Sequence, residues 1–165
     1  MFEGNAALER YYAELKRLEQ LLELNLSVIE ELEEIIWDNL EELEEYLTFL
    51  EDEERIFAEK VKASVKTILK HIQFLKDRTE KHWEDVEIHI LYLFVNKRLP
   101  QNSLLTDKYL GEFYQRLETL KDYIHLHSEL FREELERYNL FKNFPAEVYI
   151  RFLEKLTEFN REFWR

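Results

Sequence analysis

The stretch LEQLLELNLSVIEELEEIIWDNLEELEEYLTFLEDEE at residues 18–54 is acidic throughout, with fifteen Asp or Glu residues and no Lys or Arg. The next stretch, RIFAEKVKASVKTILKHIQFLKDRTEK at residues 55–81, reverses the sign, with eight Lys or Arg residues against three Asp or Glu residues. Apolar residues recur at spacings of three and four in both stretches, which is typical of amphipathic helices. The two stretches therefore predict a long antiparallel helical hairpin in which an acidic helix packs against a basic one.

The apolar residues have the spacing of a coiled-coil seam, and both seams extend beyond the quoted stretches. In the first helix the seam residues are Leu8, Tyr11, Leu15, Leu18, Leu22, Ile29, Leu32, Ile36, Leu40, Leu43, Leu47 and Leu50. In the second helix they are Ala58, Val61, Val65, Ile68, Ile72, Leu75, Trp83, Val86, Ile90 and Leu93. Each seam has one polar interruption, Asn25 in the first and Thr79 in the second. Ser27 and Glu30 form a capping-box pattern, but the seam keeps its phase there, so we expect one continuous helix.

A chain reversal near Asp52 sets the register of the predicted hairpin. Residues whose numbers sum to about 104 then face each other, which gives four acid–base pairs: Glu44–Lys60, Glu42–Lys62, Asp38–Lys66 and Glu34–Lys70. Each exposed pair contributes little on its own, but a wrong register loses all four. Because no Gly or Pro marks the turn, residues 5–99 have a second arrangement, as one uninterrupted helix in a domain-swapped dimer. We expect the hairpin, since closing a short loop costs less than joining two chains.

The rest of the chain extends the helical pattern into a bundle. Only two Gly and two Pro residues are present, too few for the many turns of a strand-rich fold. The segment Leu99–Thr106 is the expected loop, a third long helix follows it, and Asn143-Phe144-Pro145 ends that helix. Pro145 suits the first turn of a short fourth helix. We therefore predict an all-α fold, with residues 1–165 as a single helical-bundle domain: a long antiparallel hairpin, a third long helix and a short fourth helix in coiled-coil-like packing.

The two polar seam residues predict a polar layer in the core. The hairpin register places Asn25 opposite Thr79, and a second turn near residue 101 brings His127 of the third helix close to them. One interpretation is a hydrogen-bonded group that fixes the register, as a lone polar residue does in a coiled coil. In that case Asn25→Leu leaves thermal stability unchanged or raises it. The other is a metal- or small-ligand-binding site built from Asn25, Thr79 and His127, with His82 or Asp122 as further members.

Composition argues against most catalytic and cofactor chemistry. The chain has no Cys, which excludes thiolate catalysis and Cys-ligated metals, and it has no glycine-rich phosphate loop. A di-iron bundle needs Glu-x-x-His on two helices, whereas only Asp122-Tyr123-Ile124-His125 approaches that spacing. We expect no enzyme activity, no cofactor and no stoichiometric transition metal. The net charge of −13 disfavours a nucleic-acid partner.

The same composition bears on where the protein works. No stretch approaches the roughly 18 uncharged apolar residues of a membrane span, and the N-terminus lacks a signal-peptide pattern. We therefore expect a cytoplasmic protein with no membrane partner. The high Glu and Lys content, with one Met and no Cys, is typical of proteins from thermophiles.

The aromatic C-terminal helix is the candidate interaction surface. It carries more aromatic residues than one face of a short helix needs for packing, and aromatic residues are favoured at interfaces. The candidate residues are Tyr149, Phe159, Phe163 and Trp164. Packing within the chain is the other interpretation of these residues. We expect a non-enzymatic helical protein–protein interaction module (an adaptor, assembly subunit or small chaperone) with a protein partner and a preference for a homodimer.

Overall fold

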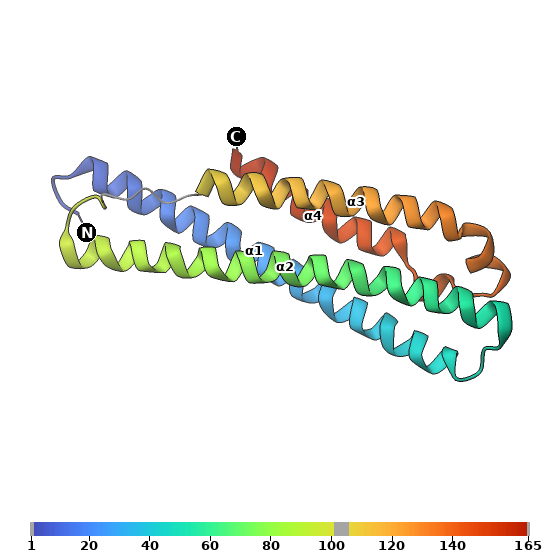
Figure 1. Ribbon diagram of the computed structural model, residues 1–165. Coiled ribbons are helices and arrows are strands. Elements are labelled where there is room, and N and C mark those ends of the chain that lie inside the picture. The colour runs from blue at the N-terminus through green and yellow to red at the C-terminus, as the bar shows by residue number, and fades with distance from the viewer. Residues whose placement is uncertain (1, 101–105, 165) are drawn as a thin grey trace.

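The computed structural model describes residues 2–100 and 106–164. These residues form four α-helices and one short 3-10 helix, and none of them lies in a strand. In chain order the elements are α1 (Ala6–Leu47), α2 (Asp52–Asn96), α3 (Thr106–Arg137), the 3-10 helix η1 (Phe141–Asn143) and α4 (Ala146–Trp164). The all-α prediction is confirmed, and α1 is one continuous helix (Figure 1). The loop expected at Leu99–Thr106 falls mostly on residues 101–105, outside the described residues.

The predicted helical hairpin is confirmed, because α1 and α2 lie antiparallel and the chain reverses at residues 48–51 (Figure 1). Lys62 pairs with Glu44, and Lys76 pairs with Glu33 at an Nζ–Oε1 distance of 3.0 Å. These pairs replace the four expected ones, since their residue numbers sum to 106 and 109. Helical side chains lean toward the N-terminus of their own helix. On antiparallel helices the side chains therefore lean in opposite directions. The side chains whose tips meet come from residues with higher numbers, on both helices, than the residues whose backbones face each other.

Helix α3 lies antiparallel on α2, in a register that differs from the expected one. Phe131 packs edge-on against Phe57 with ring centroids 5.4 Å apart, and the Tyr109 hydroxyl lies 2.6 Å from Thr79 Oγ1. The residue numbers of each pair sum to 188, which centres the reversal near residue 94 rather than residue 101. Thr106, the first residue of α3, accordingly lies beside His82. Residues 83–96 of α2 therefore extend past the start of α3.

Helix α4 completes an up-down-up-down bundle in which each helix packs against the next and α4 packs against α1. It is antiparallel to α1, because Asn160 bonds to Asn25 and Tyr149 bonds to Asn39. Figure 1 shows α4 lying beside α3 on one side of the long hairpin. With 19 residues against 42 in α1 and 45 in α2, α4 covers only part of the hairpin.

Apolar side chains from all four helices form one continuous core. Every predicted seam residue of α1 from Leu15 to Leu47 is buried, and so is every predicted seam residue of α2 from Ala58 to Leu75. In the part of α2 that extends past α3, the seam residues Val86 and Leu93 are completely buried, whereas Trp83 and Ile90 are half-buried. Most of the predicted seam residues of both helices are therefore buried.

Candidate functional site

Four of the buried polar residues, one from each helix, are linked by hydrogen bonds in the interior of the bundle: Asn25, Thr79, Tyr109 and Asn160. All four are buried, and they are termed the polar layer. Asn25 Nδ2 donates to Asn160 Oδ1 at 3.4 Å. Thr79 Oγ1 donates to the Leu75 carbonyl oxygen at 2.7 Å, which uses its only hydroxyl proton. The Tyr109 hydroxyl is therefore the donor in its 2.6 Å bond to Thr79 Oγ1.

Tyr109 joins the polar layer to His82. The two rings stack with centroids 4.5 Å apart and an interplanar angle of 12°. Burial raises the pKa of Tyr109 to about 12. Burial also lowers the pKa of His82 below its ordinary value of 6.5. At neutral pH both rings are uncharged, so the layer offers uncharged donors and acceptors.

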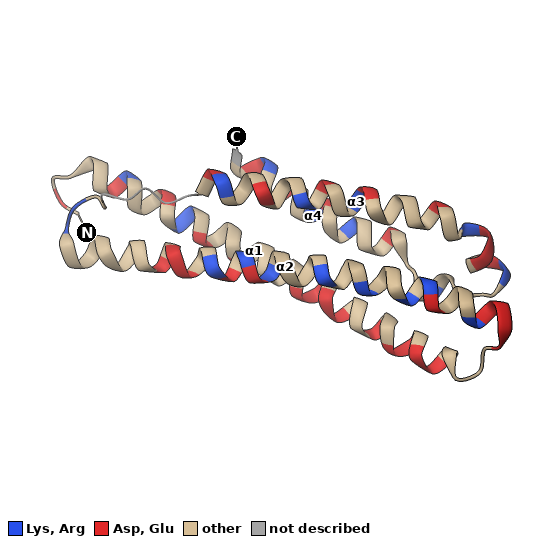
Figure 2. Ribbon diagram, viewed as in Figure 1, with Lys and Arg blue, Asp and Glu red and all other residues tan. Residues whose placement is uncertain are grey.

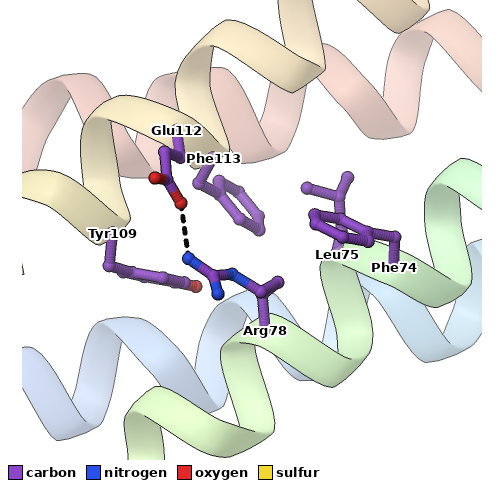
Figure 3. A pocket seen from close by; sticks show the side chains of 6 residues that line it. All are labelled: Phe74, Leu75, Arg78, Tyr109, Glu112 and Phe113. Atoms are coloured by element: carbon purple, nitrogen blue, oxygen red, sulfur yellow. Dashed lines mark hydrogen bonds and ion pairs between the residues drawn. The ribbon is translucent and has the colours of Figure 1, made fainter.

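Two atoms of the polar layer, Asn25 Oδ1 and Asn160 Nδ2, have no hydrogen-bond partner among the described residues. A small space of about 10 Å³ borders Tyr109 between α2 and α3, and the ion pair between Arg78 and Glu112 lies at its edge. Figure 3 shows the residues that line it: Phe74, Leu75, Arg78, Tyr109, Glu112 and Phe113. A space of this size holds about one water molecule, so it is too small for an organic ligand.

His127 lies far from the polar layer, contrary to the expectation. It is half-buried on α3, about 27 Å along that helix from Tyr109. Its ring packs against Tyr123 and Phe131, and its Nδ1 lies 3.0 Å from the Tyr123 carbonyl oxygen. The expectation was wrong because it assumed a reversal at residue 101. The metal- or ligand-binding set of Asn25, Thr79 and His127 is therefore not assembled.

Of the two further residues expected in that set, only one lies at the polar layer. His82 does lie at the polar layer, through its stacking on Tyr109, whereas Asp122 is exposed on α3. The described residues contain no group of three or more His, Asp or Glu side chains arranged to hold a metal ion. Among the described helices, none combines the length and the apolar content that crossing a membrane requires.

The aromatic surface expected on α4 is also largely internal. Tyr149 is completely buried, and its hydroxyl donates to Asn39 Oδ1 at 2.6 Å. Phe159 and Phe163 are half-buried and pack against the core, and the Arg17 guanidinium lies 4.7 Å from the centre of the Phe163 ring. The Trp164 side chain lies outside the described part of the structure. Tyr149 therefore belongs to the core, because the inner face of α4 needs large side chains to fill the space against α1 and α3.

A different surface has the character of a docking site. The sequence IHILYLFVN at residues 88–96 is the longest run without a charged residue in the chain, and Figure 2 shows it as the uncharged end of α2. Ile88, Leu91 and Val95 share one face of the helix at spacings of three and four. They are 61%, 63% and 70% exposed, whereas Leu93 on the opposite side is buried. Ile88, Leu91 and Val95 are termed the apolar stripe.

We compared the chain with protein-family models, with curated proteins and with solved structures, and none of these matches it.

Three parts of these sites were not predicted from the sequence. Tyr109 has the spacing of an ordinary apolar residue beside Leu110, so its buried hydroxyl gave no signal. Asn160 lies between Phe159 and Arg161 and has the appearance of a surface amide. The apolar stripe did have a signal, since nine uncharged residues in succession are unusual in a chain with 36% charged residues.

Proposed function

We propose that this protein is a non-enzymatic helical interaction module of the cytoplasm, an adaptor, assembly subunit or small chaperone, which binds a protein partner through the apolar stripe. The observation that carries the proposal is the exposure of Ile88, Leu91 and Val95 on one face of α2. Folding covers only the smaller part of these side chains, because they point away from the core. Their burial against a partner contributes roughly 1.5–3 kcal/mol for each side chain that becomes fully covered.

The bundle supports this use by holding the stripe rigid. The stripe belongs to a helix of 45 residues whose other face packs against α1, so no part of it has to be ordered on binding. A preorganised surface loses less entropy on association than a mobile one. The binding mode is helix recognition, in which apolar residues spaced three and four apart on one helix enter the groove or the seam of a partner. The polar layer, in this proposal, maintains the shape of the bundle and does not contact the partner.

The proposal is tested by photo-crosslinking in the source cell. A photoreactive amino acid replaces Leu91 in one variant and Leu126 in a control variant, since Leu126 is a similarly exposed leucine on α3. We expect a crosslinked protein from position 91 and none from position 126. The captured protein is then purified, and its binding is measured against the wild type, Leu91→Lys and Leu126→Lys. Binding that Leu91→Lys leaves intact would contradict the proposal.

A further inference from the structure

We infer that the partner of the apolar stripe is a second copy of this chain, docked antiparallel with α2 against α2. This inference rests on the proposed function and names its partner. It begins with the charges on either side of the stripe. Glu84, Asp85 and Glu87 are exposed in the turn before Ile88, and Lys97 and Arg98 are exposed just after Val95. The surface thus has an acidic end, an apolar centre and a basic end.

A two-fold axis beside Leu91 brings unlike charges together. In that arrangement Leu91 of one copy meets Leu91 of the other, and Glu84 of each copy faces Arg98 of the other. The symmetry repeats the charge contact at both ends of the interface. A parallel arrangement places acid against acid and base against base, which opposes association. The order of charges therefore selects the antiparallel pair.

Within one copy these charges have no ion-pair partner among the described residues. Arg98 Nε donates to the Tyr92 hydroxyl at 3.2 Å, which holds the guanidinium beside the stripe. Lys97 Nζ lies 5.9 Å from the centre of the Phe2 ring, on the side of α2 that faces the start of α1. Arg98 is therefore the cation that the docked Glu84 meets first.

The fold leaves room for this pairing. Helix α3 begins beside His82, so it does not cover the outer face of residues 88–96, and Figure 2 shows this end of α2 at an extremity of the molecule. When two copies overlap only at these ends, their bundles extend in opposite directions without collision. The 45 residues of α2 span about 67 Å, and the 39 residues from Asp52 to the axis at Leu91, counted in both copies, make the dimer about 117 Å long. This interface replaces the homodimer surface expected on α4, where Tyr149 is buried.

The first test measures the association of the full chain. Sedimentation equilibrium and light scattering are expected to show a reversible dimer, with small-angle scattering giving the elongated shape. Leu91→Lys places two like charges on the two-fold axis and is expected to raise the dissociation constant about tenfold or more. Leu126→Lys is the matched control and is expected to leave it unchanged. Circular dichroism of both variants checks that the helices remain folded, which is expected because both positions are exposed.

The second test uses the absence of cysteine from the natural chain. Leu91→Cys is expected to form a disulfide-linked dimer rapidly on mild oxidation, since each residue 91 meets its own copy at the axis. Leu126→Cys is expected to remain mostly monomeric. Glu84→Arg is expected to weaken the dimer several-fold, and Glu84→Arg combined with Arg98→Glu is expected to restore it. Recovery of the dimer affinity in the double variant supports the proposed order of charges. A dimer whose affinity changes in neither variant overturns it.

Two outcomes separate this inference from the proposed function. A chain that stays monomeric at its highest soluble concentration overturns the homodimer, yet the proposed function survives if position 91 still captures a different protein whose reconstituted binding Leu91→Lys abolishes. A monomer that instead binds anionic phospholipid vesicles, and loses that binding in Leu91→Lys, overturns both.

Discussion

The buried amides of Asn25 and Asn160 show how single polar residues specify the arrangement of this bundle. Both are completely buried, and they bond to each other across α1 and α4. If α4 slid along α1 by one turn, both amides would lie unpaired in an apolar core, at a cost of about 1–3 kcal/mol for each group. The pair therefore favours one register over its neighbours, whereas apolar contacts alone would tolerate several.

A substitution series tests this role. Asn25→Leu is expected to lower the free energy of unfolding by about 1–3 kcal/mol, because Asn160 loses its partner while remaining buried. This revises the expectation from the sequence, in which Asn25 was a lone polar residue. Asn25→Leu combined with Asn160→Leu removes both amides and is expected to recover most of that loss. Chemical denaturation of the four proteins in this double-mutant cycle measures the coupling. Equal stability of Asn25→Leu and the wild type would count against it.

Tyr109 gives a second prediction at this scale, in alkaline solution. Its pKa is about 12, against 10.0 for an ordinary tyrosine. Above pH 10 the unfolded chain releases this proton while the folded chain keeps it, so stability is lost as the pH rises from about 10 to about 12. The loss amounts to roughly 2–3 kcal/mol over that range. Tyr109→Phe lacks this titration, and its stability is expected to fall less steeply.

Urea unfolding at a series of pH values, with the ultraviolet absorbance of tyrosinate as a second signal, measures the difference between Tyr109→Phe and the wild type. Lysines and other tyrosines titrate in both proteins, so the comparison isolates Tyr109. Parallel stability curves for the two proteins would show that burial does not hold the Tyr109 proton.

Sequence reasoning found those members of the polar layer that interrupt an apolar seam, and only those. Asn25 and Thr79 occupy positions where the helical period predicts an apolar residue, so the sequence pattern identifies them. Tyr109 keeps the period because its ring is apolar, and only its hydroxyl bonds to Thr79. His127 was misplaced because its position depends on the register between α2 and α3, which the helical period does not determine.

At the scale of the elements, helix spacing predicted the long helices well and the contacts between them less well. The reversal near Asp52 was predicted, since the charge changes sign there. The register of α3 was not, because residues 97–105 lead from the end of α2 to a point beside His82. A connection of that length permits many starting positions for α3. Only the observed one pairs both Phe57 with Phe131 and Thr79 with Tyr109.

Helix α3 ends through a left-handed residue. Asn139 has φ of 57°, and the Leu140 amide donates to the Leu135 carbonyl oxygen at 2.7 Å, which is the pattern of a Schellman motif. Glycine adopts this conformation without the Cβ penalty. Asn139→Gly is therefore expected to leave stability unchanged or raise it by up to about 1 kcal/mol, and Asn139→Val is expected to lower it by about 1–2 kcal/mol.

Gln115→Gly is the control for this prediction, because Gln115 is exposed in the middle of α3. There glycine is expected to lower stability by about 1 kcal/mol. Thermal unfolding of the three variants distinguishes the positions by the sign of the glycine effect. A loss of stability in Asn139→Gly as large as that in Gln115→Gly would mean that the left-handed end does not matter.

At the scale of the whole molecule, the acidic and basic helices fit each other either within one chain or between two. The observed arrangement is the hairpin, with a reversal at residues 48–51 that uses a left-handed residue at Asp52, where φ is 50°. Neither Gly nor Pro lies in this turn. The hairpin is favoured because its two halves are already held at a high local concentration. The turn is therefore the part of the molecule that decides between a hairpin and a swapped pair.

Deletion of residues 48–51 is expected to convert the hairpin into a domain-swapped dimer. The deletion leaves Leu47 and Ala58 seven positions apart, one heptad, so the two seams join in phase and favour a single helix through the junction. A fused helix cannot fold back on itself, and its acidic half then pairs with the basic half of a second chain. The experiment is made in the Leu91→Lys background, so that association through the apolar stripe does not contribute. A glycine-rich replacement of residues 48–51 is the control and is expected to keep the hairpin.

A disulfide bond shows whether the acidic helix pairs with the basic helix of its own chain or with that of a second chain. Glu44 and Lys62 are in contact across the hairpin, so Glu44→Cys combined with Lys62→Cys is expected to form a bond within one chain when the turn is present. In the deletion variant the same bond is expected to link two chains, and light scattering is expected to give twice the mass of the control. A deletion variant that remains monomeric with its disulfide inside one chain would show that the helices, rather than residues 48–51, determine the reversal. Because the acid–base contacts are the same in both arrangements, the difference between them lies in the geometry of these four residues.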